Sequence, residues 1–549
     1  MSSPVGSRDK RARVEEIQGA VPVRTTQQRL PPELDAPSRD RGSRASSAET
    51  KAQSRGDGDS CQGAPKTGQY LELDRLPEDM LHHIHSLMPV QDAARVACVS
   101  RRFLRSWRCY SNLTLNLETL GLIGHSSVRS EMRYINRVDQ ILNNYSANGM
   151  KVKTLKIDLM YCRSVSASYL DRWLRIAVTS GINELSLVLC SSLKEKYCFP
   201  CSLLVDETTT SSIQSLCLVA CIFHPIETLG CFTRLKTLDL IFVHITEEGL
   251  QQLLSKSSGL ERLQMYSCSE IICLKIPCTL QKLKFLAVKS CHKIQVLEIN
   301  APILSTFHYN GFPLEINIID PSQLKDVYLA SSSPSRILSY GRAKLPSIAP
   351  NVERLTLRSR GENVNTPMLP HKLLHLRSLE IKLQRSGCSS VYDIFSVVSF
   401  LDASPVLESF ILHAQRDTIM RDCVAGDDLN HRRESVYQHD RLRRVKITGF
   451  HSAKSLIKLV IYILESAPSL ESLTLDTASG YRGKPGDTSK CTALREWSKC
   501  CRMSERDLKD AEGAVEAVGR YIAWRVPSAV EFKVLEPCRQ CNIGNLYWS

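Results

Sequence analysis

Residues 235–265 have the sequence LKTLDLIFVHITEEGLQQLLSKSSGLERLQM, and this stretch decides the fold. It begins with a six-residue template, L-x-x-L-x-L with other apolar residues allowed, and a second copy starts at residue 260. The last two apolar residues of each copy are two positions apart, so they point to one face of a short strand. Between the copies, residues 247–255 carry Leu250, Leu253 and Leu254 at helical spacing. The stretch therefore predicts a strand–helix–strand unit.

The same template recurs along most of the chain. Its copies start at residues 152, 182, 213, 235, 260, 283, 294, 304, 324, 352, 376, 407, 442 and 470. Successive starts are mostly about 20–35 residues apart, and the crowded copies at 294 and 304 indicate an abbreviated or merely strand-like unit. A strand cannot bury its apolar face alone, so we expect neighbouring strands to stack as a parallel sheet along a curved solenoid. Amphipathic stretches at 168–178 and 454–465 predict further helices on its convex side.

Cysteine recurs at one position of the repeat. Cys190, Cys221, Cys268 and Cys291 each fall eight residues after a repeat start, where such repeats take Asn or Cys to turn the chain inward. We expect these to be buried, reduced thiols. The irregular repeat lengths and this cysteine position resemble the leucine-rich repeats of plant F-box proteins. The fold predicted for residues 151–480 is thus an α/β solenoid, a leucine-rich-repeat horseshoe.

A small helical module precedes the repeats. Pro77 suits the first turn of a helix that Pro89 ends, because a helix start needs no N–H from that residue. The apolar residues of this helix share one face at helical spacing: Leu81, Ile84, Leu87 and Met88. Asp92 is expected to cap a second helix, and a third is expected at 101–107. Three short helices have a thin core, which implies a partner.

These helices resemble a known docking motif. Residues 76–115, LPEDMLHHIHSLMPVQDAARVACVSRRFLRSWRCYSNLTL, resemble an F-box, with Phe103 in place of a commoner Trp. The resemblance implies docking on the Skp-type adaptor of cullin-RING ubiquitin ligases. The positions it implies for adaptor binding are Leu76, Pro77, Leu81, Ile84, Leu87, Pro89, Asp92, Val99 and Trp107. We expect His82, His83 and His85 on the exposed helix surface or at the adaptor interface rather than at a metal.

The composition divides the chain into five segments. Residues 1–68 are polar and predicted to be disordered, and Lys10–Arg13 within them is either a nuclear-import patch or a solvated charge cluster. The F-box is assigned to 69–115, and 116–150 to a helical linker or cap with a helix at 129–148. After the repeats, 481–549 form an extension, with a helix at 511–523 and a strand at 530–535, that caps them. Its segment AVGRYIAWRVPSAVEFKVLEPCRQC resembles the tail of grass F-box/leucine-rich-repeat proteins.

The overall composition points to a globular chain with a sizeable core. Of its 549 residues, 43% are hydrophobic and 23% are charged. We see no secretory signal and no apolar run long enough for a membrane helix, so we expect the 21 cysteines to be thiols in the nucleus, the cytoplasm or both. Cys538 and Cys541, with Cys500 and Cys501, do not complete a zinc-finger spacing. No metal, cofactor or membrane partner is predicted.

Known catalytic signatures are missing from the sequence. We find no phosphate-binding loop, no G-x-S-x-G elbow and no H-E-x-x-H helix. We therefore expect a non-catalytic chain. The resemblance implies the substrate-recognition subunit of a Skp-cullin-F-box ubiquitin ligase, in which the F-box reaches cullin and RING subunits through the adaptor and the repeats hold a target protein.

Two alternatives to this function remain. The first is a nuclear scaffold or nucleic-acid-associated protein that uses the formal charge of +14, although 6% aromatic residues and no RNA-binding signature argue against it. The second is a small-ligand receptor, for which no residue set can be mapped.

The later repeats carry a candidate target-binding surface, the basic lane. It consists of outward-facing cations against one acid, Glu380, and its members are Arg354, Arg358, Lys382, Arg444 and Lys446. Such a lane would receive an acidic or phosphorylated target segment. The alternative is a solvated face whose charges only keep the protein soluble.

Overall fold

The structure is a computed structural model. It describes residues 76–107, 109–122, 128–193, 195–331, 336–360, 366–384, 393–414, 437–477 and 505–537. The predicted tail at 1–68 lies outside these residues, as do Cys500, Cys501, Cys538 and Cys541. The chain divides into two units, Met1–Leu71 and Glu72–Ser549, and all described residues lie in the second. Among the helices described, none is long and apolar enough to cross a bilayer.

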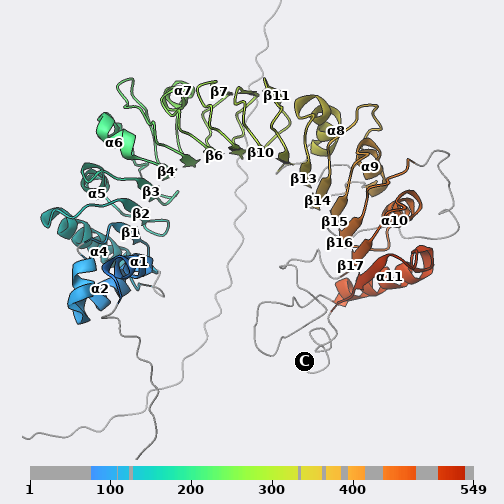
Figure 1. The fold of residues 1–549 in the computed structure, drawn as a ribbon, viewed down its shortest axis with the longest axis horizontal. Coiled ribbons are helices and arrows are strands. Elements are labelled where there is room, and N and C mark those ends of the chain that lie inside the picture. The colour runs from blue at the N-terminus through green and yellow to red at the C-terminus, as the bar shows by residue number, and fades with distance from the viewer. Residues whose placement is uncertain are drawn as a thin grey trace, which may run out of the picture. The chain divides into compact units, whose positions relative to one another are not determined.

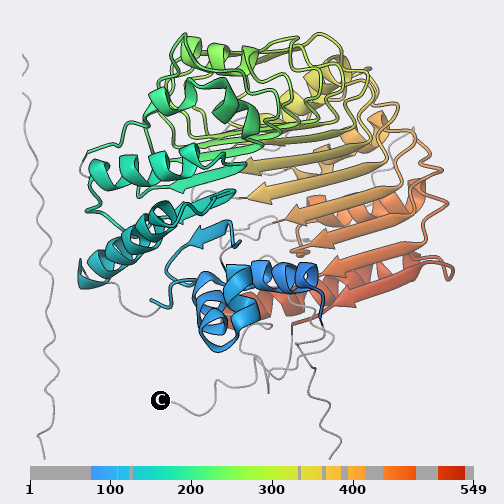
Figure 2. The same ribbon diagram turned by 60° about the vertical axis from the view of Figure 1, so that its left-hand side comes forward.

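The main sheet confirms the repeat prediction. In the described part of the chain it has 15 parallel strands that line the inner side of an arc (Figure 1). Its strands are β1 (Asn112–Leu115), β2 (Thr154–Asp158), β3 (Glu184–Val188), β4 (Ser215–Val219), β5 (Thr237–Ile241), β6 (Arg262–Tyr266), β8 (Phe285–Lys289), β10 (Thr306–Asn310), β12 (Asp326–Ala330), β13 (Arg354–Arg360), β14 (Ser378–Gln384), β15 (Ser409–Ala414), β16 (Arg444–Thr448), β17 (Ser472–Asp476) and β18 (Glu531–Leu535). Each pairs in parallel with its neighbour, as the side-by-side arrows of Figure 2 show.

Helices cover the outer side of the arc (Figure 1). The longer ones are α4 (Val128–Ala147), α5 (Ala167–Thr179), α7 (Glu247–Ser255), α8 (Ile337–Ile348), α10 (Lys454–Ser466) and α11 (Glu505–Tyr521). Two shorter α-helices are α6 (Glu207–Ser212) and α9 (Val398–Ala403), and the 3-10 helices are η2 (Cys201–Leu204), η3 (Ile394–Val397) and η4 (Ala523–Arg525). The helices expected at 168–178, 247–255 and 454–465 are confirmed, because their apolar faces pack on the core between sheet and helices.

One stretch of the outer side carries strands instead of helices. A second parallel sheet contains β7 (Cys273–Ile276), β9 (Val296–Ile299) and β11 (Glu315–Ile318). The template copy at 294 therefore lies on β9 in this outer sheet, whereas the copy at 304 lies on β10 in the main sheet. The crowding of these copies thus marks a strand on the opposite side of the solenoid rather than a shortened repeat.

The segment between F-box and repeats is itself part of the solenoid. Strand β1 pairs with β2, and α4 follows β1 in the chain as a convex helix follows its strand. The hydroxyl of Tyr134 on α4 donates to the carbonyl of Leu115 on β1 at 2.5 Å. Residues 112–147 thus form a first repeat unit rather than a separate linker. At the other end, β18 pairs with β17.

The turn after each early strand explains the recurring cysteine. Cys190, Cys221, Cys268 and Cys291 are buried and free, which confirms their predicted burial. The residues before the last three have positive φ angles of 58°, 53° and 54°; they are Ala220, Ser267 and Ser290. This left-handed residue ends the strand and turns the next side chain into the core.

Candidate functional site

The three F-box helices form as predicted, but only some of the residues predicted to bind the adaptor lie on their exposed faces. They are α1 (Glu78–Leu87), α2 (Val90–Val99) and α3 (Arg101–Trp107). Helix α2 begins at Val90 with Pro89 as its N-cap residue, so Asp92 lies in the first turn and pairs with Arg95 at 3.3 Å. The prediction that Asp92 caps this helix is therefore wrong, because the fixed backbone of Pro89 already starts it three residues earlier than expected.

Large apolar side chains of this module lie in solvent. Leu87 on α1 is 71% exposed and Val99 at the end of α2 is 84% exposed. Met80 lies seven residues before Leu87 on α1, so the two side chains share one face of the helix. Met80 and Leu104 on α3 are also exposed. We call these four residues the exposed apolar set. Sequence reasoning missed Met80 and Leu104, although both are apolar residues next to core positions.

The other residues implied for adaptor binding differ in exposure. Pro77, Pro89 and Asp92 are exposed, whereas Leu76, Ile84 and Trp107 are half-buried. The carbonyl of Leu76 accepts a hydrogen bond from Arg102 at 2.5 Å, and the ring of Trp107 stacks on Tyr110.

Two residues that were expected at the surface lie in the core of the F-box module. Leu81 is only 2% exposed, so it supports the helix packing in the free chain, and its contact with the adaptor stays a prediction. His85, expected on an exposed surface, is also buried, since it shares the α1 face of Leu81 at i, i+4 spacing. Its Nε2 donates to the carbonyl of Ala93 at 2.9 Å, and aromatic rings surround it with centroids 5.4–5.9 Å away. These rings belong to Phe103, Trp107 and Tyr110.

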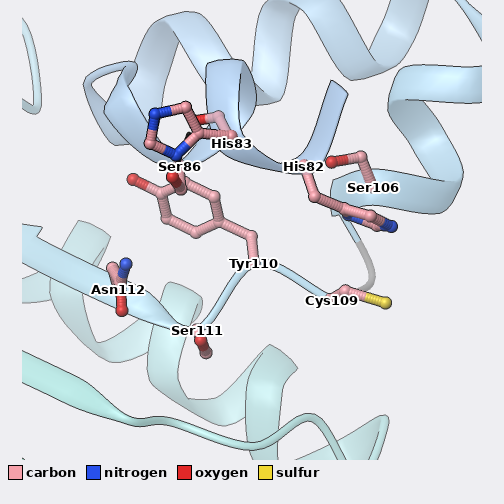
Figure 3. A pocket seen from close by; sticks show the side chains of 8 residues that line it. All are labelled: His82, His83, Ser86, Ser106, Cys109, Tyr110, Ser111 and Asn112. Carbon is pink, nitrogen blue, oxygen red and sulfur yellow. Dashed lines mark hydrogen bonds between the residues drawn. The ribbon is translucent and has the colours of Figure 1, made fainter. Parts of the chain in front are cut away.

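A polar pocket of about 310 Å³ lies between α1, the end of α3 and the start of β1 (Figure 3). It is lined by His82, His83, Ser86, Ser106, Cys109, Tyr110, Ser111 and Asn112. The Ser106 hydroxyl is buried and has no hydrogen-bond partner. Because His82 lines this pocket and His85 lies in the core, the two imidazoles do not form a site together. No cluster of three metal-binding side chains occurs in the described part of the chain.

The basic lane lies on the concave face, as the strand register requires. Arg358 on β13 is directly opposite Lys382 on β14, and Arg444 and Lys446 lie on β16. Several of its charges have partners, however. Arg354 pairs with Asp326 on β12 at 3.0 Å, and Arg358 donates to the side-chain oxygen of Gln384. Sequence reasoning counted one acid here because Asp326 belongs to the preceding strand.

Glu380 is the acid that pairs with Lys382 of the lane and with His413. Its carboxylate lies 3.0 Å from Lys382 Nζ and 2.9 Å from His413 Nε2. Burial alone would raise the pKa of Glu380, but these hydrogen bonds and charges outweigh it and lower the pKa below its usual value. The lane is thus largely a paired network, and its exposed cations are Arg354, Arg444 and Lys446.

A second concave feature was missed by sequence reasoning. The rings of Phe285 on β8, His308 on β10 and Tyr328 on β12 contact one another in series, with centroids 5.0 Å and 5.4 Å apart. Arg262 on β6 lies over the Phe285 ring at 3.9 Å. Each residue occupies an outward position of the repeat template, and a search for aromatic rather than charged residues at these positions would have found them.

Comparison with known proteins matches both parts of this architecture. Residues 73–112 match the F-box domain, and residues 141–539 match the family model described as the LRR domain of At1g61320/AtMIF1. The second match alone spans more than half of the chain. The chain belongs to the plant F-box/leucine-rich-repeat family.

Relatives of this F-box/leucine-rich-repeat protein occur in Arabidopsis thaliana. It is 24% identical over 424 residues to "Putative FBD-associated F-box protein At1g61330", covering 73% of this chain and 90% of the relative. It is 22% identical over 431 residues to "F-box/LRR-repeat protein At5g02910", covering 73% of this chain and 87% of the relative. An F-box domain indicates binding to a Skp-type adaptor in general, and this architecture is typical of non-catalytic substrate adaptors.

Proposed function

We propose that this chain is the substrate-recognition subunit of a Skp-cullin-F-box ubiquitin ligase in the nucleus, the cytoplasm or both. The F-box docks the adaptor, which brings cullin and RING subunits, and the concave face of the repeats holds a target protein. The observation that carries the proposal is the exposed apolar set on a small helical module, in one chain with a 15-stranded solenoid sheet.

The exposed apolar set favours a protein partner on physical grounds. Burying one large aliphatic side chain contributes about 1.5–3 kcal/mol, so leaving several in solvent forgoes a substantial stabilisation. A partner that covers Leu87 and Val99 recovers this energy. Apolar anchors of this kind dominate the energy of small interfaces.

The chain then acts by proximity. A target held on the concave face is tethered to the RING-bound conjugating enzyme, which raises the effective concentration of its lysines near the activated ubiquitin. Ubiquitin transfer itself belongs to other subunits.

One hydrogen-bonded chain of polar side chains lies on the repeats. His244 contacts Lys196 at 2.5 Å and Glu270 at 2.7 Å. These side chains are partly exposed to solvent, as those of surface ion pairs are.

The test is adaptor binding by the purified full chain. Replacing Met80 and Leu87 together by Glu should weaken binding to a Skp-type adaptor about thirtyfold or more, because two anchors would carry buried charges. Met132→Glu is the matched control, since Met132 is a comparably exposed methionine on α4 (46% against 54% for Met80). Equal adaptor binding by the double variant and the control would contradict the proposal.

Salt dependence separates this function from a nucleic-acid role. Binding of the chain to single- or double-stranded nucleic acid that falls steeply with salt, without adaptor binding, would favour the scaffold alternative.

A further inference from the structure

Arg262 is a surface arginine that is already held in place. Its guanidinium lies over the ring of Phe285 at 3.9 Å, on the strand directly beside it. One terminal nitrogen donates to the side-chain oxygen of Gln264 at 3.1 Å. The residue is nevertheless exposed, so other N–H groups of the fork face solvent. A guanidinium fixed in this way loses little conformational entropy when it binds a carboxylate.

The aromatic rings beside Arg262 are not needed for the core. The inward residues of the same strands are buried and fill the space beneath the sheet, for example Leu286 and Phe307. Phe285, His308 and Tyr328 lie on the opposite face and are only half-buried. Ala287, between Phe285 and His308, is fully buried beneath them. The three rings therefore form a continuous row on the concave surface, which we call the aromatic row.

The polar groups around the aromatic row define what it can bind. Burial lowers the pKa of His308, and the charges of Lys289 and Arg262 lower it further against the opposing charge of Asp326. The imidazole is therefore neutral near pH 7 and behaves as a polar aromatic ring. On the other side, Asp239 on β5 has a buried carboxylate oxygen without a hydrogen-bond partner. Asp239 is directly opposite Gln264, the residue that holds Arg262.

We propose that Arg262 and the aromatic row bind an extended segment of the target protein that carries a carboxylate beside an aromatic or large aliphatic side chain. The carboxylate pairs with the held guanidinium, and the apolar side chain packs on His308 and Tyr328. This inference rests on the proposed function, whose target surface it places around β5–β12 rather than in the basic lane.

A protein segment fits this surface better than single-stranded nucleic acid. Bases need open aromatic faces, but a face of the Phe285 ring is covered by Arg262. Phosphates need a track of cations, whereas Asp239 and Asp326 lie beside the row. Tryptophan, tyrosine and arginine, in contrast, are enriched among the residues that dominate the energy of protein interfaces.

The experiment selects random peptides displayed on phage against the full chain bound to its adaptor. We expect enriched peptides with Asp or Glu next to an aromatic or large aliphatic residue. Arg262→Gln and Phe285→Ala should each weaken the enriched peptides about tenfold or more. Arg354→Gln is the matched control, because Arg354 occupies the equivalent strand position but pairs with Asp326, and it should leave binding unchanged.

Each other result overturns the inference. No enriched motif, an enriched motif without an acid, or equal binding by Arg262→Gln would exclude this surface. Loss in Arg354→Gln alone would assign the target to the basic lane. Competition by a single-stranded oligonucleotide that Phe285→Ala abolishes would assign the row to nucleic acid. His308→Ala, whose side chain lies outside the core, provides a second variant if Phe285→Ala unfolds.

The two proposals fail separately. Adaptor binding is measured on the same preparations, and the aromatic-row variants should retain it. If the aromatic-row variants lose peptide binding and keep adaptor binding, the effect belongs to the aromatic row and leaves the ligase function untouched. A wild-type chain that binds the selected peptides but no adaptor contradicts the ligase function instead.

Discussion

Arg342 on α8 is a charged residue almost out of solvent, with 2% of its surface exposed. Its guanidinium donates to three backbone carbonyls, at 3.0 Å to Ser399, 2.9 Å to His371 and 2.6 Å to Leu369. Burial lowers the pKa of Arg342, and the charge of Asp402 opposes this. One side chain thus joins α8 to the segments before β14 and to α9, none of which follows the repeat template.

Replacing Arg342 by Met should lower the free energy of unfolding by about 3 kcal/mol or more, because one buried and two partly buried carbonyls lose their donor at about 1–3 kcal/mol each. Arg342→Lys should recover only part of this, since an ammonium is a compact point donor and cannot copy the planar fork. Lys344→Met on the same helix is the control, because Lys344 is exposed. Urea unfolding curves that coincide for Arg342→Met and Lys344→Met would refute this role.

At the scale of elements, the outer sheet replaces helices where the connections are short. The links between β6, β8 and β10 contain β7 and β9 and no helix. An extended strand crosses the outer side with fewer residues than a helix, because each residue rises about 3.3 Å rather than 1.5 Å. The last convex helix before this sheet is α7, and its Glu247 carboxylate accepts the backbone N–H groups of Ile272 and Cys273, the latter at 2.8 Å.

Glu247 therefore accepts hydrogen bonds from two backbone N–H groups at the start of β7, an edge strand of the outer sheet. We expect Glu247→Ala to lower the free energy of unfolding by about 1–3 kcal/mol, because two backbone donors lose a charged acceptor. Its neighbour Glu248 is exposed, and Glu248→Ala should leave stability within about 0.5 kcal/mol. Hydrogen exchange at Ile272 and Cys273 should speed up in the first variant only. Unchanged exchange at both amides would show that the contact does not hold the sheet.

At the scale of the whole molecule, many charged side chains of the described repeats are paired with a charge of the opposite sign. At the residue before each strand from β12 to β17, charges of opposite sign alternate and pair across neighbouring repeats. These pairs are Lys325–Glu353 at 3.1 Å, Arg377–Glu408 at 2.8 Å and Arg443–Glu471 at 3.2 Å. Each exposed pair contributes little energy by itself. The pairing nevertheless explains why charged side chains at these positions do not by themselves mark a binding surface.

Two histidines on the concave face predict that acid lowers the stability of the fold. The pKa of His308 and that of His413 both lie below the usual 6.5, through burial and nearby cations. The unfolded chain then binds more protons than the folded chain, so the stability from both groups is present above pH 6.5 and is lost as pH falls through their folded pKa values. Urea midpoints should drop between pH 7 and pH 5.5, and less so in a His308→Gln/His413→Gln variant. An equal drop in both proteins would contradict this origin.

The sequence by itself determined the strands of the solenoid, several convex helices and the buried cysteines. These features depend on local periodicity: a side-chain period of two on a strand and about 3.6 on a helix. The template copy at 294 shows the boundary of this reasoning. An apolar strand pattern states that a face is buried, but it does not state on which side of the solenoid the strand lies.

The tertiary structure alone decided which outward residues meet. Phe285, His308 and Tyr328 come from separate repeats, and only the register of β8, β10 and β12 brings their rings into contact. The same holds for Asp326, which pairs with Arg354 from the next strand, and for His85, whose aromatic neighbours follow on α3 and beyond. Repeat patterns specify inward residues because burial is a property of each strand. Contacts on the outward face depend on cross-strand neighbours, which a linear period does not contain.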